Sequence, residues 1–305
     1  MHLPIMVREV LEHLRPRAGE LAIDCTLGAG GHAEALLAHL LPGGRLIALD
    51  VDPVEGPRTM ARLAAAGHGP AHLTLHAANF SALPGICAAE CPRGADLILA
   101  DLGVSAMQLD TAERGFSYKS VGPLDMRMDP SHGEPASQLL ARLDAPALAR
   151  LLTDYADEPH AAVIAGLLTS QPCDTTHAAE RLVRIGLHAA RPELSKAAVK
   201  MSVRRTFQAL RIAVNNELGA LDALLQALPA CLAPGGRVAI LTFHSGEDRR
   251  VKKAFQAGHR AQVYARISTS PVRSGKVETF SNRRAQAAKL RWAVRRSANA
   301  SIIGA

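Results

Sequence analysis

The segment Leu21-Ala22-Ile23-Asp24-Cys25-Thr26-Leu27-Gly28-Ala29-Gly30-Gly31-His32 joins a predicted strand, Leu21–Thr26, through a glycine turn to a helical pattern that reaches about Leu41. Glycines directly after a strand let the backbone turn tightly and approach a ligand, because no Cβ intervenes. A second predicted strand, Arg45–Leu49, ends at Asp50, about 20 residues beyond Gly28. An acidic side chain at this spacing suits the ribose hydroxyls of an adenosine cofactor. The combination predicts a nucleoside-cofactor site.

Short apolar runs alternate with helical patterns up to Asp101. His72–His76 is a weaker third strand candidate, and Asp96–Ala100 is a fourth that ends at Asp101. Strands that alternate with helices in this way form parallel units whose crossovers share one hand. We therefore predict an α/β fold built on a Rossmann-like, doubly wound and mostly parallel sheet.

This alternation stops after the fourth strand. From Val104 to Pro135 the chain reads as a loop rich in glycine and proline, and then apolar residues recur at helical spacing. The predicted helices are Pro146–Tyr155, Pro159–Thr169, Thr176–Leu187 and Ser195–Leu228. Strand character returns after the turn Pro234-Gly235-Gly236, in the segments Arg237–Phe243, Gln262–Ile267 and Lys289–Val294. The last two suit a closing antiparallel pair. We expect an all-α domain, 119–205, inserted between two parts of one α/β domain, 1–118 and 206–305.

Composition narrows the class of protein. The 305 residues carry a formal net charge of +7, with 48% hydrophobic and only 3% aromatic residues, as in a globular protein with an aliphatic core. Three clusters of arginine and lysine in the second half of the chain favour a polyanionic partner. The five cysteines are odd in number and form no C-x-x-C pair, which argues against a disulfide scaffold and a zinc site. We expect a cytoplasmic protein without bound metal or membrane anchor.

The acidic strand ends bear on the choice of cofactor. Asp24, Asp50 and Asp101 each lie at or near the end of a predicted strand, which favours a cationic cofactor such as S-adenosylmethionine over a pyrophosphate. Phe80, after the third strand, suits either an adenine ring or plain core packing. A nicotinamide oxidoreductase shares the glycine turn and Asp50, so it stands as an alternative at this point.

Charged loops should flank the same crevice, because ligands of open α/β sheets bind beyond the carboxyl ends of the strands. These loops are Arg114–Tyr118, Leu124–Pro130 and Phe243–Arg249. Asp125, Arg127 and Asp129 are either functional or a local ion-pair cluster that fixes the loop. Hydrolase elbow, zinc-protease and phosphate-loop motifs do not occur.

Motifs along most of the chain resemble one known family. They include Asp24–His32, Asp50-Val51-Asp52-Pro53, Asn79-Phe80-Ser81, Asp101–Ser105, Arg114–Ser117, Gly122–Asp129, Thr206–Ile212, Phe243–Arg249 and Ala288–Arg291. In this order they resemble the ribosomal RNA small subunit methyltransferase H family, also called MraW. The resemblance implies a class I methyltransferase sheet with an inserted helical domain. It implies transfer of a methyl group from S-adenosylmethionine to the N4 amine of a cytidine near the decoding centre of 16S rRNA.

The resemblance also assigns cofactor positions and a substrate. The cofactor positions carried over are Gly30, Gly31, His32, Asp50, Phe80, Asp101 and Gln108. The implied partner is 16S rRNA or the small ribosomal subunit, and the oligomeric state is open between monomer and homodimer. Two further alternatives share this fold: a methyltransferase for a different RNA or DNA base, and a non-catalytic RNA-binding assembly factor.

The implied reaction needs a proton acceptor and residues that bind RNA. An amine conjugated with a ring is a poor nucleophile, so we expect positioning to dominate and an acceptor to assist. The candidate acceptors are Asp125, Asp129, His244 and Ser245, and for His244 a purely structural role is the alternative. The candidate RNA contacts are Phe116, Tyr118, Arg127, Arg249, Arg283, Arg284, Lys289 and Arg291.

Overall fold

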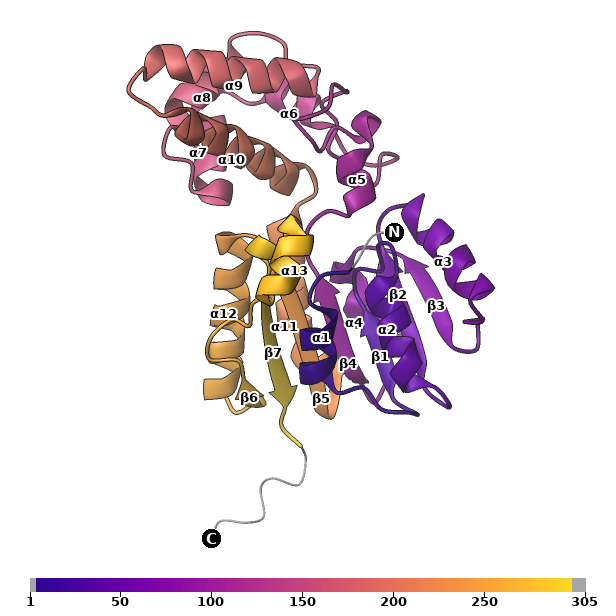
Figure 1. Ribbon diagram of the computed structural model, residues 1–305. Coiled ribbons are helices and arrows are strands. Elements are labelled where there is room, and N and C mark those ends of the chain that lie inside the picture. Colours follow the sequence, from indigo (N-terminus) through magenta and orange to yellow (C-terminus); the bar gives the residue numbers. More distant parts are fainter. Residues whose placement is uncertain (1–3, 298–305) are drawn as a thin grey trace. The chain divides into compact units, whose positions relative to one another are not determined.

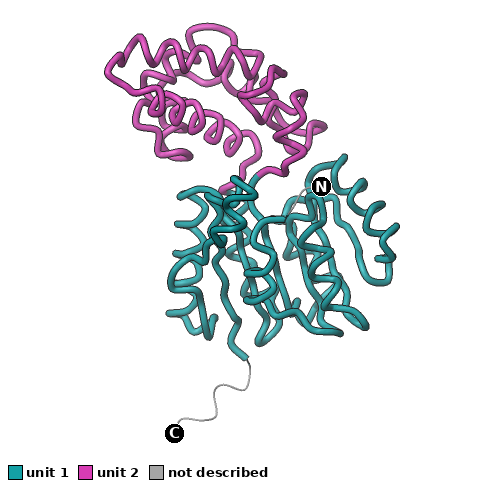
Figure 2. The backbone as a smooth tube through the Cα atoms, viewed as in Figure 1, with its two compact units in different colours: residues 1–103, 219–305 teal, residues 104–218 magenta. Residues whose placement is uncertain are grey.

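The computed structural model describes residues 4–297, which form two compact units. The first unit consists of the chain up to Gly103 and again from Gly219 onward, and the second is the continuous segment Val104–Leu218 (Figure 2). No helix among the described residues is both long and apolar enough to cross a bilayer.

A seven-stranded sheet organises the first unit (Figure 1). Its strands are β1 (Leu21–Asp24), β2 (Arg45–Asp50), β3 (Leu73–Ala77), β4 (Ala95–Asp101), β5 (Leu232–Thr242), β6 (Tyr264–Ile267) and β7 (Lys289–Arg295). They lie in the order β3-β2-β1-β4-β5-β7-β6. β1 to β5 pair in parallel, whereas β7 is antiparallel to both β5 and β6. The predicted doubly wound sheet and its closing antiparallel pair are confirmed.

Helices cover both faces of this sheet. One face packs against α1 (Val7–Leu14), α2 (Gly31–Leu40) and α3 (Glu55–Ala65), and the other against α4 (Leu83–Glu90), α11 (Glu217–Cys231) and α12 (Ser245–Arg260). Neighbouring residues of one strand face opposite sides, so Leu46 and Ala48 of β2 join the first core, and Ile47 and Leu49 join the second. Burial on both faces explains why the strands read as continuous apolar runs.

The second unit is helical and has a core of its own. Its helices are α5 (Ala106–Asp110), α6 (Ala136–Arg142), α7 (Ala145–Ala156), α8 (Ala161–Thr169), α9 (Thr176–Ala190) and α10 (Lys196–Val214). Buried side chains from these helices, among them Leu148, Ile164 and Leu210, form one hydrophobic cluster.

The helical unit, Val104–Leu218, is wider than the expected 119–205. At its start, Phe116 is buried in the helical core, so the loop before residue 119 belongs with the helices. At its end, α10 continues through residue 205 without a break, and its buried Phe207 packs in the same core. Boundaries based on hydrophobic periodicity missed both features, because these features depend on which core buries a residue.

Local details also differ from the sequence-based expectation. The single helical stretch Ser195–Leu228 is two helices, because Asn216 has a left-handed φ of 46° that ends the run. β5 begins at Leu232 rather than Arg237, because Leu232 pairs with Ala95 ahead of a bulge that contains the expected turn. Part of the expected loop 104–135 is helical, in α5 and in the 3-10 turn Ala112–Arg114.

Candidate functional site

Three carboxylates gather at the carboxyl edge of the sheet. Asp50 ends β2, Asp24 ends β1 and Asp101 ends β4, and these strands are direct neighbours in the order β2-β1-β4. Parallel strands end at the same edge, so the fold brings together side chains that are far apart in sequence. The structure thus places the predicted acidic groups in one site of the first unit.

Asp50 fixes the glycine turn. Its Oδ2 accepts a hydrogen bond of 2.7 Å from the backbone N–H of Gly28, and its Oδ1 accepts one of 2.8 Å from that of Asp52. Burial raises the pKa of Asp50 above its ordinary value. Each carboxylate oxygen has two acceptor sites, so the side chain retains capacity for ribose hydroxyls.

Asp24 and Asp101 each carry one oxygen that lacks a partner. Asp24 Oδ2 and Asp101 Oδ1 are buried and accept no hydrogen bond. Burial raises the pKa of Asp101 to about 7, with a further contribution from the negative charge of Glu247. Burial likewise raises the pKa of Asp24. Buried acceptors without donors are rare and costly, and a cationic ligand with N–H donors would satisfy them.

His32 lies beside these carboxylates as a neutral ring. Its Nε2 donates to the Ile5 carbonyl oxygen at 2.9 Å, and its Nδ1 lies 3.6 Å from Asp101 Oδ2. Burial lowers the pKa of His32, which favours the neutral form. The N-terminal segment therefore orients the ring of His32 beside Asp101.

The glycines serve two different purposes. A Cβ on Gly30 would lie 2.6 Å from Thr59 Cγ2, and one on Gly31 would lie 2.7 Å from Pro4 Cγ. These two residues are small because α3 and the N-terminal segment pack against them. Gly28, with a φ of 48°, would meet nothing closer than the Thr26 carbonyl oxygen at 3.9 Å. Close approach of a ligand to the backbone is therefore possible at Gly28.

The other two predicted cofactor residues have visible structural roles. Phe80 packs against the core on one face of the sheet, as the core-packing alternative predicts. It is only half-buried, so part of its side chain remains exposed. Gln108 lies in the second unit, where it is buried. Its Oε1 accepts from Ser105 N–H at 2.9 Å, and its own N–H donates to Ser105 Oγ at 3.1 Å, so this pair caps α5.

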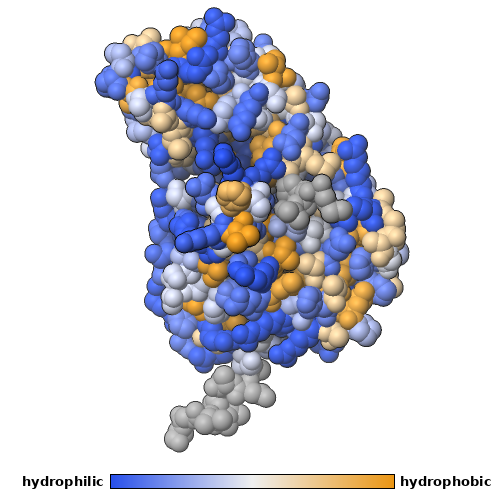
Figure 3. Space-filling model, in the orientation of Figure 1, coloured by the Kyte–Doolittle hydropathy of each residue, from blue (hydrophilic) through white to orange (hydrophobic). Residues whose placement is uncertain are grey.

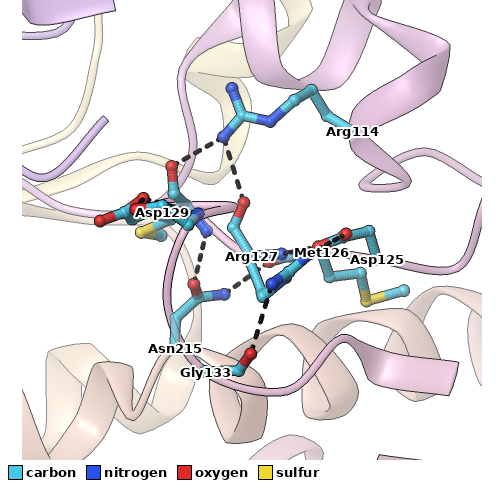
Figure 4. A network of polar contacts seen from close by, with 9 residues as sticks. Arg114, Asp125, Met126, Arg127, Asp129, Gly133 and Asn215 are labelled. Carbon is cyan, nitrogen blue, oxygen red and sulfur yellow. Dashed lines mark hydrogen bonds and ion pairs between the residues drawn. The ribbon is translucent and has the colours of Figure 1, made fainter. Parts of the chain in front are cut away.

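The loop Asp125–Asp129 of the second unit is held by a polar network (Figure 4). Arg127 donates from Nε and Nη2 to the two oxygens of Asp125, at 2.8 and 2.7 Å. Met126 has a left-handed φ of 66°, and Asn215 clamps it by donating to the Met126 carbonyl oxygen and accepting from Met128 N–H, both at 2.7 Å. Arg114 donates to the carbonyl oxygens of Arg127 and Met128. These contacts match the alternative in which local ion pairs and hydrogen bonds fix the loop.

These contacts reduce the basicity of the two candidate acceptors on the loop. Burial by itself would raise the pKa of Asp125, but the hydrogen bonds from Arg127 outweigh it and hold that pKa below its ordinary value. For Asp129 the same balance holds, with Ser131 and His132 as the partners that lower its pKa. A carboxylate stabilised in this way is a weaker proton acceptor.

His244 is the N-cap of α12, as the structural alternative predicts. Its Nδ1 accepts from the backbone N–H of Glu247 at 3.4 Å, while Glu247 Oε2 accepts from the backbone N–H groups of Phe243 and His244. A neutral ring whose Nδ1 accepts carries its proton on Nε2, so its one lone pair is engaged by the start of the helix. The geometry does not favour His244 as a base. Ser245, the first residue of α12, is exposed.

Sequence reasoning missed Glu247. This side chain is 2% exposed, caps the start of α12 and raises the pKa of Asp101. The spacing His244-x-x-Glu247 is that of a capping box, which was the available signal. Its electrostatic effect on Asp101 could not be read from sequence, because the two residues meet only through the pairing of β4 with β5.

The predicted RNA contacts of the first unit differ in how far they are exposed. Arg249, Arg283 and Arg284 are exposed in the first unit. Arg291 is 3% exposed and donates to Asp248 at 2.6 Å, and Lys289 donates to the same carboxylate at 3.0 Å. These two residues join β7 to α12, and a phosphate would have to displace Asp248 to reach them. We do not retain them as RNA contacts.

The aromatic candidates of the second unit are engaged in packing within that unit. Phe116 is 6% exposed within the helical core, which leaves little of its face for a base. Tyr118 is half-buried and meets Phe207 edge to face, with 5.4 Å between the ring centroids. Arg127 is bound to Asp125 as described above. Stacking on Phe116 would require the core to open, so that prediction is withdrawn.

The fold and the carboxylate site define a class of protein. A seven-stranded sheet of this order, with a glycine turn and unpartnered acidic groups at its carboxyl edge, suits a sulfonium nucleoside with an amino-acid tail. The residues present therefore fit S-adenosylmethionine, and the protein is a class I methyltransferase.

Comparison with known proteins identifies the family. The MraW methylase family matches residues 1–296, and this chain belongs to it. The sequence is 44% identical over 300 residues to ribosomal RNA small subunit methyltransferase H 2 of Alkaliphilus metalliredigens, covering 97% of this chain and 85% of that protein. It is 48% identical over 257 residues to ribosomal RNA small subunit methyltransferase H of Myxococcus xanthus, covering 84% and 80%. A solved putative rRNA-methylase from Clostridium thermocellum is similar at a TM-score of 0.44 and 9% identity, covering 97% and 100%.

Proposed function

We propose that this methyltransferase transfers a methyl group from S-adenosylmethionine to the N4 amine of a cytidine in 16S rRNA near the decoding centre. The observation that carries the cofactor assignment is the pair of buried, unpartnered oxygens of Asp24 and Asp101. The substrate assignment is supported by the names of relatives that are 44% and 48% identical. We expect the enzyme in the cytoplasm, together with its ribosomal substrate.

In this proposal, different residues of the first unit bind different parts of the cofactor. Asp50 accepts hydrogen bonds from the ribose hydroxyls, and the backbone at Gly28 lies along the nucleoside. Asp24 and Asp101 offer their unpartnered oxygens to the cationic parts of the ligand. The exposed part of Phe80 lies against the adenine. Gln108 lies in the second unit, where it caps α5.

When bound, S-adenosylmethionine supplies a methyl group on a positively charged sulfur, which is the electrophile. The protein contributes mainly by holding the amine nitrogen in line with that methyl group, and such positioning supplies about 7–11 kcal/mol in favourable cases. Asp125 and Asp129 are already paired and weakly basic, so we assign them to shaping the loop rather than to taking the proton. Arg249, Arg283 and Arg284 contact phosphates.

A direct test is mass spectrometry of 16S rRNA fragments from cells with and without this protein. Loss of one N4-methylated cytidine in the mutant, restored by the wild-type gene, is the expected result. A mark lost from a different base would redirect the substrate assignment to another target. An unchanged rRNA, together with normal binding of S-adenosylmethionine to the purified protein, would contradict the proposal and favour a non-catalytic assembly factor.

Asp50→Ala tests the cofactor site separately. The carboxylate accepts from the glycine turn and is assigned to the ribose, so calorimetry should show binding of S-adenosylmethionine weakened by at least about 100-fold. Circular dichroism should show a folded protein. Asp154→Asn, at an exposed carboxylate of the second unit, is the matched control. Wild-type affinity in Asp50→Ala would defeat the ribose assignment.

A further inference from the structure

A short helix of the first unit, α13 (Lys276–Ser281), exposes apolar side chains and turns polar ones inward. Val277 is 85% exposed and Phe280 is 92% exposed, more than any other large hydrophobic side chain among residues 4–297. Positions three apart lie on one face of a helix, so these two side chains are neighbours. An ordinary surface helix has the opposite arrangement, with its apolar stripe against the core.

The inward face of α13 is fixed by polar contacts. Glu278 Oε1 accepts from the backbone N–H of Met6 at 2.6 Å. Thr279 Oγ1 donates to the Gly275 carbonyl oxygen and pairs with Ser274 Oγ, each at 3.0 Å. These bonds hold the helix without help from Phe280, so the fold does not account for an aromatic side chain at this exposed position. Two such exposed apolar side chains side by side on an anchored helix make this face a candidate binding surface.

The surroundings of this apolar pair are positively charged. Between Arg273 and Arg284 the chain has four basic residues and one acidic residue. The basic residues are exposed, namely Arg273, Lys276, Arg283 and Arg284. The acidic residue is Glu278, whose carboxylate is bound to Met6. In Figure 3 the surface at the place of α13 is hydrophobic and lies among strongly hydrophilic atoms.

The patch is linked to the cofactor site through two consecutive residues. Met6 donates to Glu278 on α13, and the preceding Ile5 carbonyl oxygen accepts from His32 Nε2 at 2.9 Å. His32 in turn lies beside Asp101, at 3.6 Å. A strand of RNA that delivers a base to the carboxylate edge therefore has α13 within reach of its neighbouring nucleotides.

We infer that the face formed by Val277 and Phe280 stacks an unpaired base of the substrate RNA, while the surrounding arginines and Lys276 hold its phosphates. The inference rests on the proposed function and extends it to the nucleotides beside the target. Single-stranded RNA is recognised by stacking of bases on aromatic rings next to cationic side chains. A second copy of this chain fits poorly, because like charges would meet. Two apolar side chains also fall far short of the roughly 800 Å² per partner of a stable interface.

The test measures the affinity for a fluorescein-labelled, single-stranded RNA oligonucleotide without self-complementarity, by fluorescence anisotropy and without methyl donor. Phe280→Ala should weaken binding by about 5- to 150-fold, the range for one stacked base. Phe280→Trp should bind at least as tightly as the wild type, whereas Phe280→Leu should resemble Phe280→Ala, because leucine is apolar but not planar. Ile185→Ala, at a half-exposed apolar position on α9, is the matched control.

Salt dependence separates stacking from charge. Phe280→Ala should leave the slope of log affinity against log salt unchanged, whereas Arg283→Ala should reduce it by about 0.7 for a single strand. Thermal unfolding of Phe280→Ala should match the wild type, because the ring is 92% exposed.

Three outcomes would overturn the inference. They are wild-type affinity in Phe280→Ala, wild-type affinity in Phe280→Leu, and a loss of self-association in Phe280→Ala measured by sedimentation. The last would make this face an interface between copies. Because the assay needs no turnover, the methylation proposal can fail while this inference stands, and the reverse also holds.

Discussion

The folded protein disfavours the ionised form of Asp101. One oxygen is buried without a partner, and burial, together with Glu247, raises the pKa of this carboxyl from an ordinary 3.8 to about 7. The folded state therefore binds the proton more tightly than the unfolded state. Linkage then makes folding less favourable as the pH rises from 3.8 toward about 7, and the full cost is present above that range. Such a residue is retained for a ligand rather than for stability.

Removal of this charge should stabilise the protein and abolish its function. Asp101→Asn should raise the midpoint of thermal unfolding by a few degrees at pH 8 and much less at pH 5, because the carboxyl is largely protonated at pH 5. Calorimetry should show strongly weakened binding of S-adenosylmethionine. Asp154→Asn, at an exposed position, should change neither property. A larger stabilisation at pH 5 than at pH 8 would contradict the linkage.

The affinity for the cofactor should itself depend on pH. A cationic ligand favours the ionised carboxylates, so binding displaces protons from Asp24 and Asp101, whose pKa values burial has raised. We expect the affinity for S-adenosylmethionine to rise between pH 5.5 and 7.5, by up to about tenfold per pH unit for each proton released. Isothermal titration in buffers of different ionisation enthalpy measures that release. S-adenosylhomocysteine, whose sulfur is neutral, should respond less, and equal responses would argue against a carboxylate near the sulfonium.

At the scale of the element, β7 and α12 are joined by one buried cluster of charges. Asp248, near the start of α12, accepts from Arg291 and Lys289 of β7. Burial would raise the pKa of Asp248, but these hydrogen bonds outweigh it and hold the pKa below its ordinary value. Lys289 and Arg291 of β7 therefore fix α12 to the sheet.

Arg291→Met should uncouple these two elements. Removal of one partner leaves Asp248 with a charge that is only partly compensated, and such changes cost about 3–5 kcal/mol. Urea unfolding measures the loss, while the salt slope of RNA binding should stay unchanged. Arg249→Met, on the exposed side of the same helix, should give the reverse pattern: little loss of stability and a smaller slope. A stable Arg291→Met variant with weakened RNA binding would restore Arg291 as a phosphate contact.

At the scale of the whole molecule, the second unit is a continuous segment with its own core (Figure 2). We expect the fragment 104–218 to fold alone, with a helical circular dichroism spectrum and a single cooperative transition in urea. Leu210→Asp in the same fragment puts a charge at a fully buried position and is the unfolded control. Gradual unfolding of the wild-type fragment, like that of the control, would show that its core depends on the first unit.

Much of the fold was predictable because each pattern had one local cause. Burial on both faces makes β2 and β4 continuous apolar runs, and the glycine turn marks the end of β1. The helix break at Asn216 and the bulge at the start of β5 were missed, because one backbone angle and one strand pairing decide them. α1 and α12 were also not predicted, although His244-x-x-Glu247 gives a capping signal for α12.

Local sequence patterns are enough to specify the alternating α/β architecture, the insertion of a helical unit, the acidic strand ends and the family. Each of these depends on residue types at short spacing, where local periodicity and turn chemistry act. Which charged and aromatic side chains can meet a ligand depends instead on the folded arrangement of the chain. It pairs Arg291 with Asp248, buries Phe116, leaves an oxygen of Asp101 without a partner and exposes Phe280. Pairing and burial depend on contacts between residues far apart in the chain, and no local pattern encodes those contacts.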